Sequence, residues 1–122
     1  MADSPDATDE IARALADRRR ALEAELGITG ERLGDIRAAR ADTVADDEHD
    51  PEGPTLAAEW SRAEGQRADT LSELADLEAA EARLAAGTYG VCEGCGRSIP
   101  PARLAVRPAA RRCVACAEGA GR

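Results

Sequence analysis

The chain has 122 residues, of which 33% are charged and 2% are aromatic, and its formal net charge is −8. This composition excludes a large mixed core and is typical of long helices with solvated faces, since Ala, Leu, Glu and Arg dominate. No apolar run approaches the roughly eighteen residues that a membrane-spanning helix needs, so we expect a soluble chain with no membrane partner.

The charge is distributed unevenly along the chain. Residues 1–91 hold 22 acidic residues against 10 Arg, whereas residues 92–122 hold 6 Arg against 2 Glu. The sequence therefore predicts an acidic arm joined to a mildly basic C-terminal part.

The first long helix is predicted to follow a short disordered N-terminus, residues 1–7. Thr8 is suited to cap this helix, because Asp9 and Glu10 then lie in its first turn and complement the helix dipole. The apolar positions that recur at helical spacing are Ile11, Leu15, Leu22, Leu26, Leu33, Ile36 and Val44.

Glycines interrupt this helical pattern. Gly27, Gly30 and Gly34 each weaken a helix by about 1 kcal/mol relative to alanine. We therefore expect a kink or break near residues 26–31.

An acidic turn is predicted at residues 46–54, where two prolines and a glycine fall within four residues and cannot continue a helix. A second helix follows, capped by Thr55 and stopped by Gly87. Its apolar positions are Leu56, Trp60, Leu71, Leu74, Leu77 and Leu84. Residues 8–86 are therefore predicted to fold back as an antiparallel hairpin with a narrow coiled-coil seam, into which Trp60 packs.

Four cysteines form the most specific pattern in the chain. Cys92 with Cys95, and Cys113 with Cys116, make two Cys-x-x-Cys pairs separated by seventeen residues, a spacing typical of a structural zinc site. Each pair presents two sulfurs at one turn, and the loop is long enough to complete a tetrahedron. Because protein sulfur takes all four positions, we expect one structural Zn²⁺ that performs no chemistry.

The residues around the pairs support this interpretation. Gly94 and Gly96 permit turns in which backbone amides point at thiolate sulfurs. The apolar residues available to cover a metal site are Tyr89, Ile99, Leu104 and Val106. This surface is too small for a metal-free core, so metal binding and folding are predicted to be coupled.

Two disulfides are the alternative use of four cysteines, and they need an oxidising compartment. Residues 1–30 show no export signal, so we expect a cytoplasmic, zinc-bound protein. The single histidine, His49, lies in the acidic turn far along the chain from the cysteines. No catalytic triad or phosphate-binding loop can be assembled, and we expect a non-enzyme without catalytic residues.

Residues 87–116 resemble the DksA/TraR zinc-finger family of bacterial transcription regulators. The resemblance rests on the run Gly-Thr-Tyr-Gly-Val-Cys-Glu-Gly-Cys-Gly-Arg-Ser-Ile that begins at Gly87, then on Arg103-Leu104, Arg107-Pro108 and the second cysteine pair. It implies a mainly α fold, with a long antiparallel two-helix coiled-coil hairpin over residues 8–86. A small C-terminal four-cysteine zinc-finger globule follows over residues 87–122.

The family binds RNA polymerase and inserts the hairpin tip through the secondary channel, where tip carboxylates alter open-complex stability. The resemblance thus implies a monomeric regulator of initiation that recognises polymerase and no specific DNA sequence. Asp47, Asp50 and Glu52 are the tip residues it implies. Asp47 and Asp50 keep the family's acidic spacing, but Glu52 stands in place of the family's alanine. A register that starts at Asp50 places Gly53 at the second acidic position and Thr55 at the alanine.

Family members act together with the alarmone guanosine tetraphosphate, which cations hold near the base of the hairpin. Counted from the cysteines, the family's lysine positions are Asp76 and Ala117 in this chain, which leaves Arg107 as the candidate polymerase or phosphate contact. We expect weak or absent alarmone dependence, since an acidic side chain repels a polyphosphate.

Two other interpretations stay open. A zinc-stapled coiled-coil adaptor would bind another protein and use its acidic turn for solubility alone. A DNA-binding zinc finger would bind duplex through its basic side with an affinity that falls steeply with salt. The residues of that basic side are Arg97, Arg103, Arg107, Arg111 and Arg112.

Overall fold

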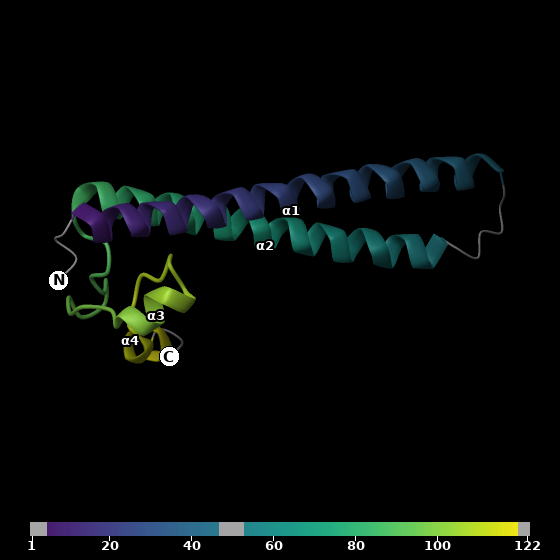
Figure 1. Cartoon of the computed structure of the whole chain (residues 1–122). Helices are drawn as coiled ribbons and strands as arrows, with labels where there is room; N and C mark the ends of the chain where they lie inside the picture. The colour runs from purple at the N-terminus through teal and green to yellow at the C-terminus, as the bar shows by residue number, and fades with distance from the viewer. Residues whose placement is uncertain (1–4, 47–52, 120–122) are drawn as a thin grey trace. The chain divides into compact units, whose positions relative to one another are not determined.

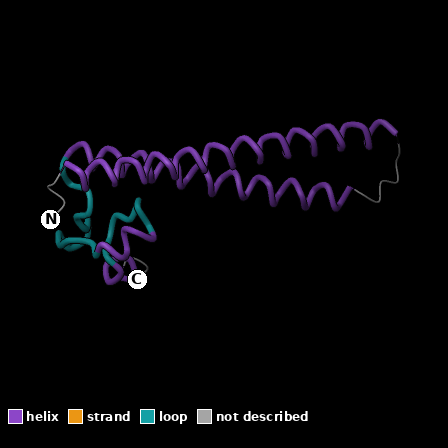
Figure 2. Tube along the Cα trace, in the orientation of Figure 1, coloured by secondary structure: helices purple, strands orange, loops and turns teal. Residues whose placement is uncertain are grey.

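The computed structural model describes residues 5–46 and 53–119, which form four helices joined by loops (Figures 1 and 2). The helices are α1 (Pro5–Asp46), α2 (Gly53–Ala86), α3 (Pro101–Val106) and α4 (Val114–Gly119). The described residues contain no strand, although Val91 and Ser98 form an isolated antiparallel bridge. None of the described helices is long and apolar enough to cross a membrane.

The chain divides into two compact units. Met1–Arg20 with Leu74–Arg122 form the first, and Ala21–Glu73 form the second. Each unit contains a segment of α1 and a segment of α2, and the first also contains the four cysteines.

In the second unit the helices run antiparallel. Arg32 of α1 donates a hydrogen bond of 3.4 Å to the side chain of Gln66, and the Arg37 guanidinium lies 5.6 Å from the ring centre of Trp60. Residue numbers therefore fall along α2 as they rise along α1. Leu33, Ile36 and Ala63 form the buried cluster here, and Leu56 and Trp60 pack against it. The predicted place of Trp60 in the helix seam is thus confirmed.

In the first unit the two helices are held by a buried apolar strip and by ion pairs. Leu15, Leu77 and Ala80 are at most 1% exposed. Beside them Arg19 of α1 pairs with Glu81 of α2, and its guanidinium lies 3.8 Å from Glu78. The ion pairs are partly exposed and contribute little, so burial of the apolar strip carries most of the stability.

Buried positions recur every seven residues on both long helices, which is the repeat of a coiled coil. They are Leu15, Leu22, Thr29 and Ile36 on α1, and Ala63, Thr70 and Leu77 on α2. The predicted seam was right for the leucines and the isoleucine. It missed the alanine and both threonines, because short or polar side chains do not stand out in an apolar pattern. It was wrong for Leu71, which is 40% exposed one residue past Thr70.

The first helix departs from its prediction in two ways. It begins at Pro5 rather than Thr8, so residues 5–7 are helical. Proline is tolerated in the first helical turn, because an N–H at that position would have no intrahelical acceptor, so its absence costs no hydrogen bond. The helix also continues unbroken through residues 26–31. Thr29 within this stretch and Leu33 just after it are buried, and this packing offsets the cost of the nearby glycines.

The second helix begins at Gly53 rather than Thr55, so Pro54 lies in the first helical turn, which tolerates proline. It ends at Ala86 as predicted. Gly87 has φ of +81° and donates to the Leu84 carbonyl, while the Thr88 N–H donates to the Arg83 carbonyl at 2.8 Å. These bonds form a Schellman cap, which requires a residue of this conformation and explains the glycine.

The predicted tip lies outside the described residues. This holds for Asp47, Asp50 and Glu52, and also for His49. The structure describes the helices on either side, up to Asp46 and from Gly53 onward.

Candidate metal centre

The first cysteine pair lies on a short turn between α2 and α3. The Cys92 N–H donates to the Arg97 carbonyl at 2.8 Å, and the Gly96 N–H donates back to the Cys92 carbonyl at 2.9 Å. Gly96 adopts φ of +75°, a conformation that side chains disfavour. This closed turn directs Cys92 and Cys95 to the same side.

The second pair spans the start of α4. Cys113 precedes the helix and Cys116 lies within its first turn, where the Ala117 N–H donates to the Cys113 carbonyl at 2.9 Å. A helical turn brings residues three apart onto one face, so both sulfurs face the first pair.

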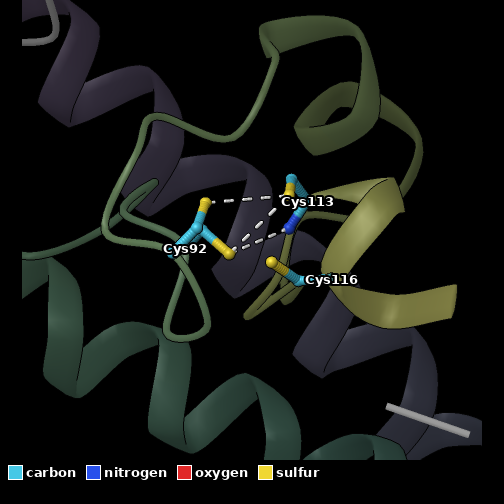
Figure 3. Close-up of side chains that lie close together, drawn as sticks. Cys92, Cys113 and Cys116 are labelled. Carbon is cyan, nitrogen blue, oxygen red and sulfur yellow. Dashed lines mark hydrogen bonds between the residues drawn. The ribbon is translucent and has the colours of Figure 1, made fainter. Parts of the chain in front are cut away.

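The four sulfurs gather at one point. All lie within 4.8 Å of one another, with Cys92 and Cys113 at 3.8 Å and Cys95 and Cys113 at 4.0 Å. Figure 3 shows the side chains of Cys92, Cys113 and Cys116 brought close together. All four cysteines are free, so the disulfide alternative is wrong for this structure.

These distances fit zinc. Sulfurs about 2.3 Å from one Zn²⁺ at the corners of a tetrahedron lie about 3.8 Å apart. A disulfide needs about 2.05 Å. Four sulfur donors suit a closed structural site, with no position for a reacting water.

Backbone geometry around Gly94 supports the cluster. A Cβ at this position would lie 2.9 Å from the Cys116 sulfur and 3.0 Å from its Cβ, so any larger residue pushes a ligand away. The Gly94 N–H also lies 3.3 Å from the Cys92 sulfur, to which it donates. Gly94 therefore permits the close approach of the two pairs, a role that the sequence did not predict. Its amide points at a cysteine sulfur as expected, but the expected positive φ is found at Gly96 and not at Gly94.

The cysteines differ in acidity. The Cys113 N–H, which donates to the Cys92 sulfur at 3.3 Å, lowers the pKa of Cys92 to about 6, against the opposing effect of burial. Hydrogen bonds with the sulfurs of Cys113 and Cys92 favour the protonated thiol of Cys116 and raise its pKa to about 12. A thiolate and a thiol therefore share the site without metal, and a divalent cation releases the remaining protons on binding.

The zinc affinity is expected to fall more steeply with acidity below pH 6 than above it. Cys92 is ionised above its lowered pKa, so protons compete with zinc for this sulfur only below about pH 6. Each pH unit below that value then adds a further loss of about tenfold from this ligand. Competition with a chromophoric chelator from pH 5 to 8 measures the slope. An unchanged slope across pH 6 contradicts the assignment.

Apolar cover over the site is smaller than predicted. Ile99 is 3% exposed and Leu104 is half-buried, but Val106 is 81% exposed and does not contribute. Val106 is the last residue of α3, and its side chain points to solvent. The Tyr89 hydroxyl donates to the Pro108 carbonyl at 2.7 Å. Burial raises the pKa of Tyr89, while Arg83 acts in the opposite direction.

The sequence did not predict the contacts of the residues just before Cys113. The Arg111 guanidinium pairs with the Asp76 carboxylate of α2 at 3.4 Å, and the Arg103 Nε donates to the Arg112 carbonyl at 2.7 Å. Arg107 is exposed at the end of α3. The basic side chains near the zinc site are therefore partly engaged within the protein.

The two short helices α3 and α4 were also not predicted. Six-residue helices are too short for apolar periodicity. The Pro100-Pro101 pair was the available signal for α3, since proline favours the first helical position and Pro101 occupies it.

Comparisons with known proteins bear on the finger and on the fold. Residues 87–120 match the family model described as the prokaryotic dksA/traR C4-type zinc finger. A stretch of 48 residues is 42% identical to an uncharacterized protein of Aquifex aeolicus (strain VF5). This stretch covers 39% of the chain and 33% of that relative, so the match spans about a third of the relative's length.

The structure of transcription factor DksA2 from Pseudomonas aeruginosa resembles most of this chain. The TM-score is 0.77 at 22% sequence identity, over 93% of this chain and 82% of that one. This likeness bears on the fold, and it confirms the predicted mainly α fold class. The predicted structural zinc site is confirmed by the match to the C4-type finger and by the clustering of the four sulfurs.

Proposed function

We propose that this chain, whose residues 87–120 are a DksA/TraR C4-type zinc finger, regulates transcription initiation by binding RNA polymerase. The observation that carries this proposal is the combination of that finger with a DksA2-like fold over 93% of the chain. A zinc finger alone is compatible with many partners. The long two-helix element attached to it is the part that distinguishes this class of regulator.

The proposed mechanism places the hairpin tip in the polymerase secondary channel. The chain between α1 and α2 contains Asp47, Asp50 and Glu52. The secondary channel leads to a Mg²⁺ centre, where added carboxylates can alter metal coordination or the cations that bind nucleotide phosphates. The zinc ion then has a structural role, and the chain performs no catalysis of its own.

Substitutions at the tip are expected to remove regulation while leaving polymerase binding intact. Asp50→Asn and Glu52→Gln delete charge with little change in shape, and the finger that supports binding is untouched. In vitro transcription from a responsive promoter and a polymerase binding assay measure the two effects. Asp42→Asn, an exposed carboxylate on α1, is the matched control and is expected to act as wild type.

The outcomes separate the rival functions. Full regulation by both tip variants contradicts the tip mechanism. Absence of polymerase binding by wild type favours an adaptor for another protein. Tight binding to free duplex that falls with salt favours a DNA-binding finger.

The response to guanosine tetraphosphate is proposed to be weak. Asp76 carries a negative charge where the family has a lysine, and its carboxylate is paired with Arg111 at 3.4 Å. Ala117 adds no charge at the second lysine position, which leaves Arg107, exposed at the end of α3, as the proposed phosphate contact. Transcription with and without the alarmone is expected to differ by less than about twofold. A large synergistic shift contradicts this expectation.

The proposal also covers the cellular compartment in which the protein works and its oligomeric state. Polymerase works in the cytoplasm, and a chain that enters its channel acts there as a monomer. The four free cysteines agree with a reducing compartment.

A further inference from the structure

A short segment touches both the zinc site and α2. Residues 108–113, here called the linking segment, run from the end of α3 to the start of α4. All of its contacts described below lie within the first unit.

On one side the linking segment is bonded to the first cysteine turn. The Cys113 N–H donates to the Cys92 sulfur at 3.3 Å, and the Arg111 carbonyl accepts the Glu93 N–H at 2.9 Å. Cys113 itself supplies one of the four sulfurs. A metal held by both pairs therefore fixes this side of the segment.

On the other side the linking segment is bonded to the last three turns of α2. The Arg111 guanidinium pairs with Asp76, and Arg83 donates to the Ala109 carbonyl at 3.5 Å. Ala110, between the two, is 9% exposed, and its N–H donates to the Arg107 carbonyl at 3.0 Å. Residues 109 and 111 contact α2, and residues 111 and 113 contact the cysteine turn, so the two sets of contacts meet at Arg111.

We infer that the linking segment couples zinc occupancy to the stability of the C-terminal part of α2, residues 76–86. Arg111 is the central residue, because its carbonyl is bonded to the cysteine turn while its side chain is bonded to α2. When the metal leaves, the ion no longer ties the Cys113 sulfur to the sulfurs of the first pair, and the N–H contact to the Cys92 sulfur is left alone to hold the segment there. A segment this short cannot move at Cys113 and keep its α2 contacts unchanged.

Coupling of this kind is reciprocal. If zinc stabilises residues 76–86 through the linking segment, contacts between the segment and α2 must raise the zinc affinity by the same factor. Through the linking segment, the stability of residues 76–86 of α2 therefore changes when zinc binds or leaves. The inference holds whatever partner the chain binds, so it does not depend on the proposed function.

Amide hydrogen exchange of the full chain, zinc-loaded and after treatment with a chelator, tests the first half of the inference. We expect exchange across residues 76–86 to be at least about tenfold faster without zinc. Residues 56–70, in the second unit, are an internal reference and are expected to exchange at the same rate in both states. Equal rates across residues 76–86 with and without zinc overturn the inference, as does equal acceleration of the reference.

Zinc affinities of two matched variants test the reciprocal half. Asp76→Ala removes the ion pair with Arg111 and is expected to weaken zinc binding roughly two- to fivefold, the range for a partly exposed pair. Glu78→Ala, on the same helix, removes a pairing with Arg19 that does not involve the linking segment, and is expected to leave zinc affinity unchanged.

A double variant that exchanges the two charges of the ion pair is the third test of the coupling. The double variant Asp76→Arg with Arg111→Asp reverses the ion pair and is expected to restore most of the zinc affinity. Equal zinc affinities of Asp76→Ala and Glu78→Ala overturn the inference, and so does a double variant no better than Asp76→Ala.

Discussion

Cys92→Ser is expected to lower the zinc affinity on the order of a thousandfold and to unfold residues 87–119. A structural zinc site stabilises its fold by about 10–16 kcal/mol, shared among four ligands, so one lost thiolate removes a large part. Cys92 is also 2% exposed, and its sulfur accepts the N–H groups of Gly94 and Cys113. Serine oxygen is a poorer zinc ligand, and the few buried apolar residues of the finger, Ile99 and Ala110 with half-buried Leu104, give it little core without the metal.

Chelator competition and the zinc content of the purified protein measure this effect, and circular dichroism follows the fold. Arg97→Ala is the control, because its side chain is exposed on the same turn. It should keep stoichiometric zinc. The second unit should stay helical in Cys92→Ser, since its cluster contains no cysteine. A Cys92→Ser protein with wild-type zinc affinity contradicts the assigned ligand set.

Leu77→Ala is expected to lower the free energy of unfolding by about 2–5 kcal/mol. Leu77 is 1% exposed, and its truncation leaves a cavity in a seam that has few large apolar residues to fill it. The loss is a large fraction of the stability of an ordinary domain.

Urea unfolding followed by circular dichroism measures this change. Leu71→Ala makes the same chemical change at a position that is 40% exposed, and it should cost less than about 1 kcal/mol. Equal losses in the two variants contradict the heptad register, which buries one leucine and exposes the other.

Local signals in the sequence were enough to predict the metal site. Cysteine spacing specifies which sulfurs can meet, and the glycines beside the first pair were expected to aim amides at sulfur, as the Gly94 N–H does. The end of α2 was equally predictable, because the Schellman cap needs a positive φ at Gly87. In these places the chemistry of one residue decides the structure.

Features that depend on tertiary packing were not predictable in the same way. The packing of Thr29 and Leu33 carries α1 through its glycines, although propensity alone indicated a break. The pairing of Arg111 with Asp76 joins residues 35 apart in sequence, and no local pattern marks it. The heptad threonines required the two long helices to be placed side by side first, and the ion pair required the linking segment to be placed against α2.

The most direct test of the proposed function is competition for core RNA polymerase with a transcript-cleavage factor, which enters through the secondary channel. The account predicts that this chain displaces a labelled cleavage factor in a saturable manner. It also predicts that Asp50→Asn with Glu52→Gln displaces it equally well, since binding does not need the tip charges. Polymerase that binds this chain while retaining the cleavage factor, or that does not bind it at all, contradicts the account.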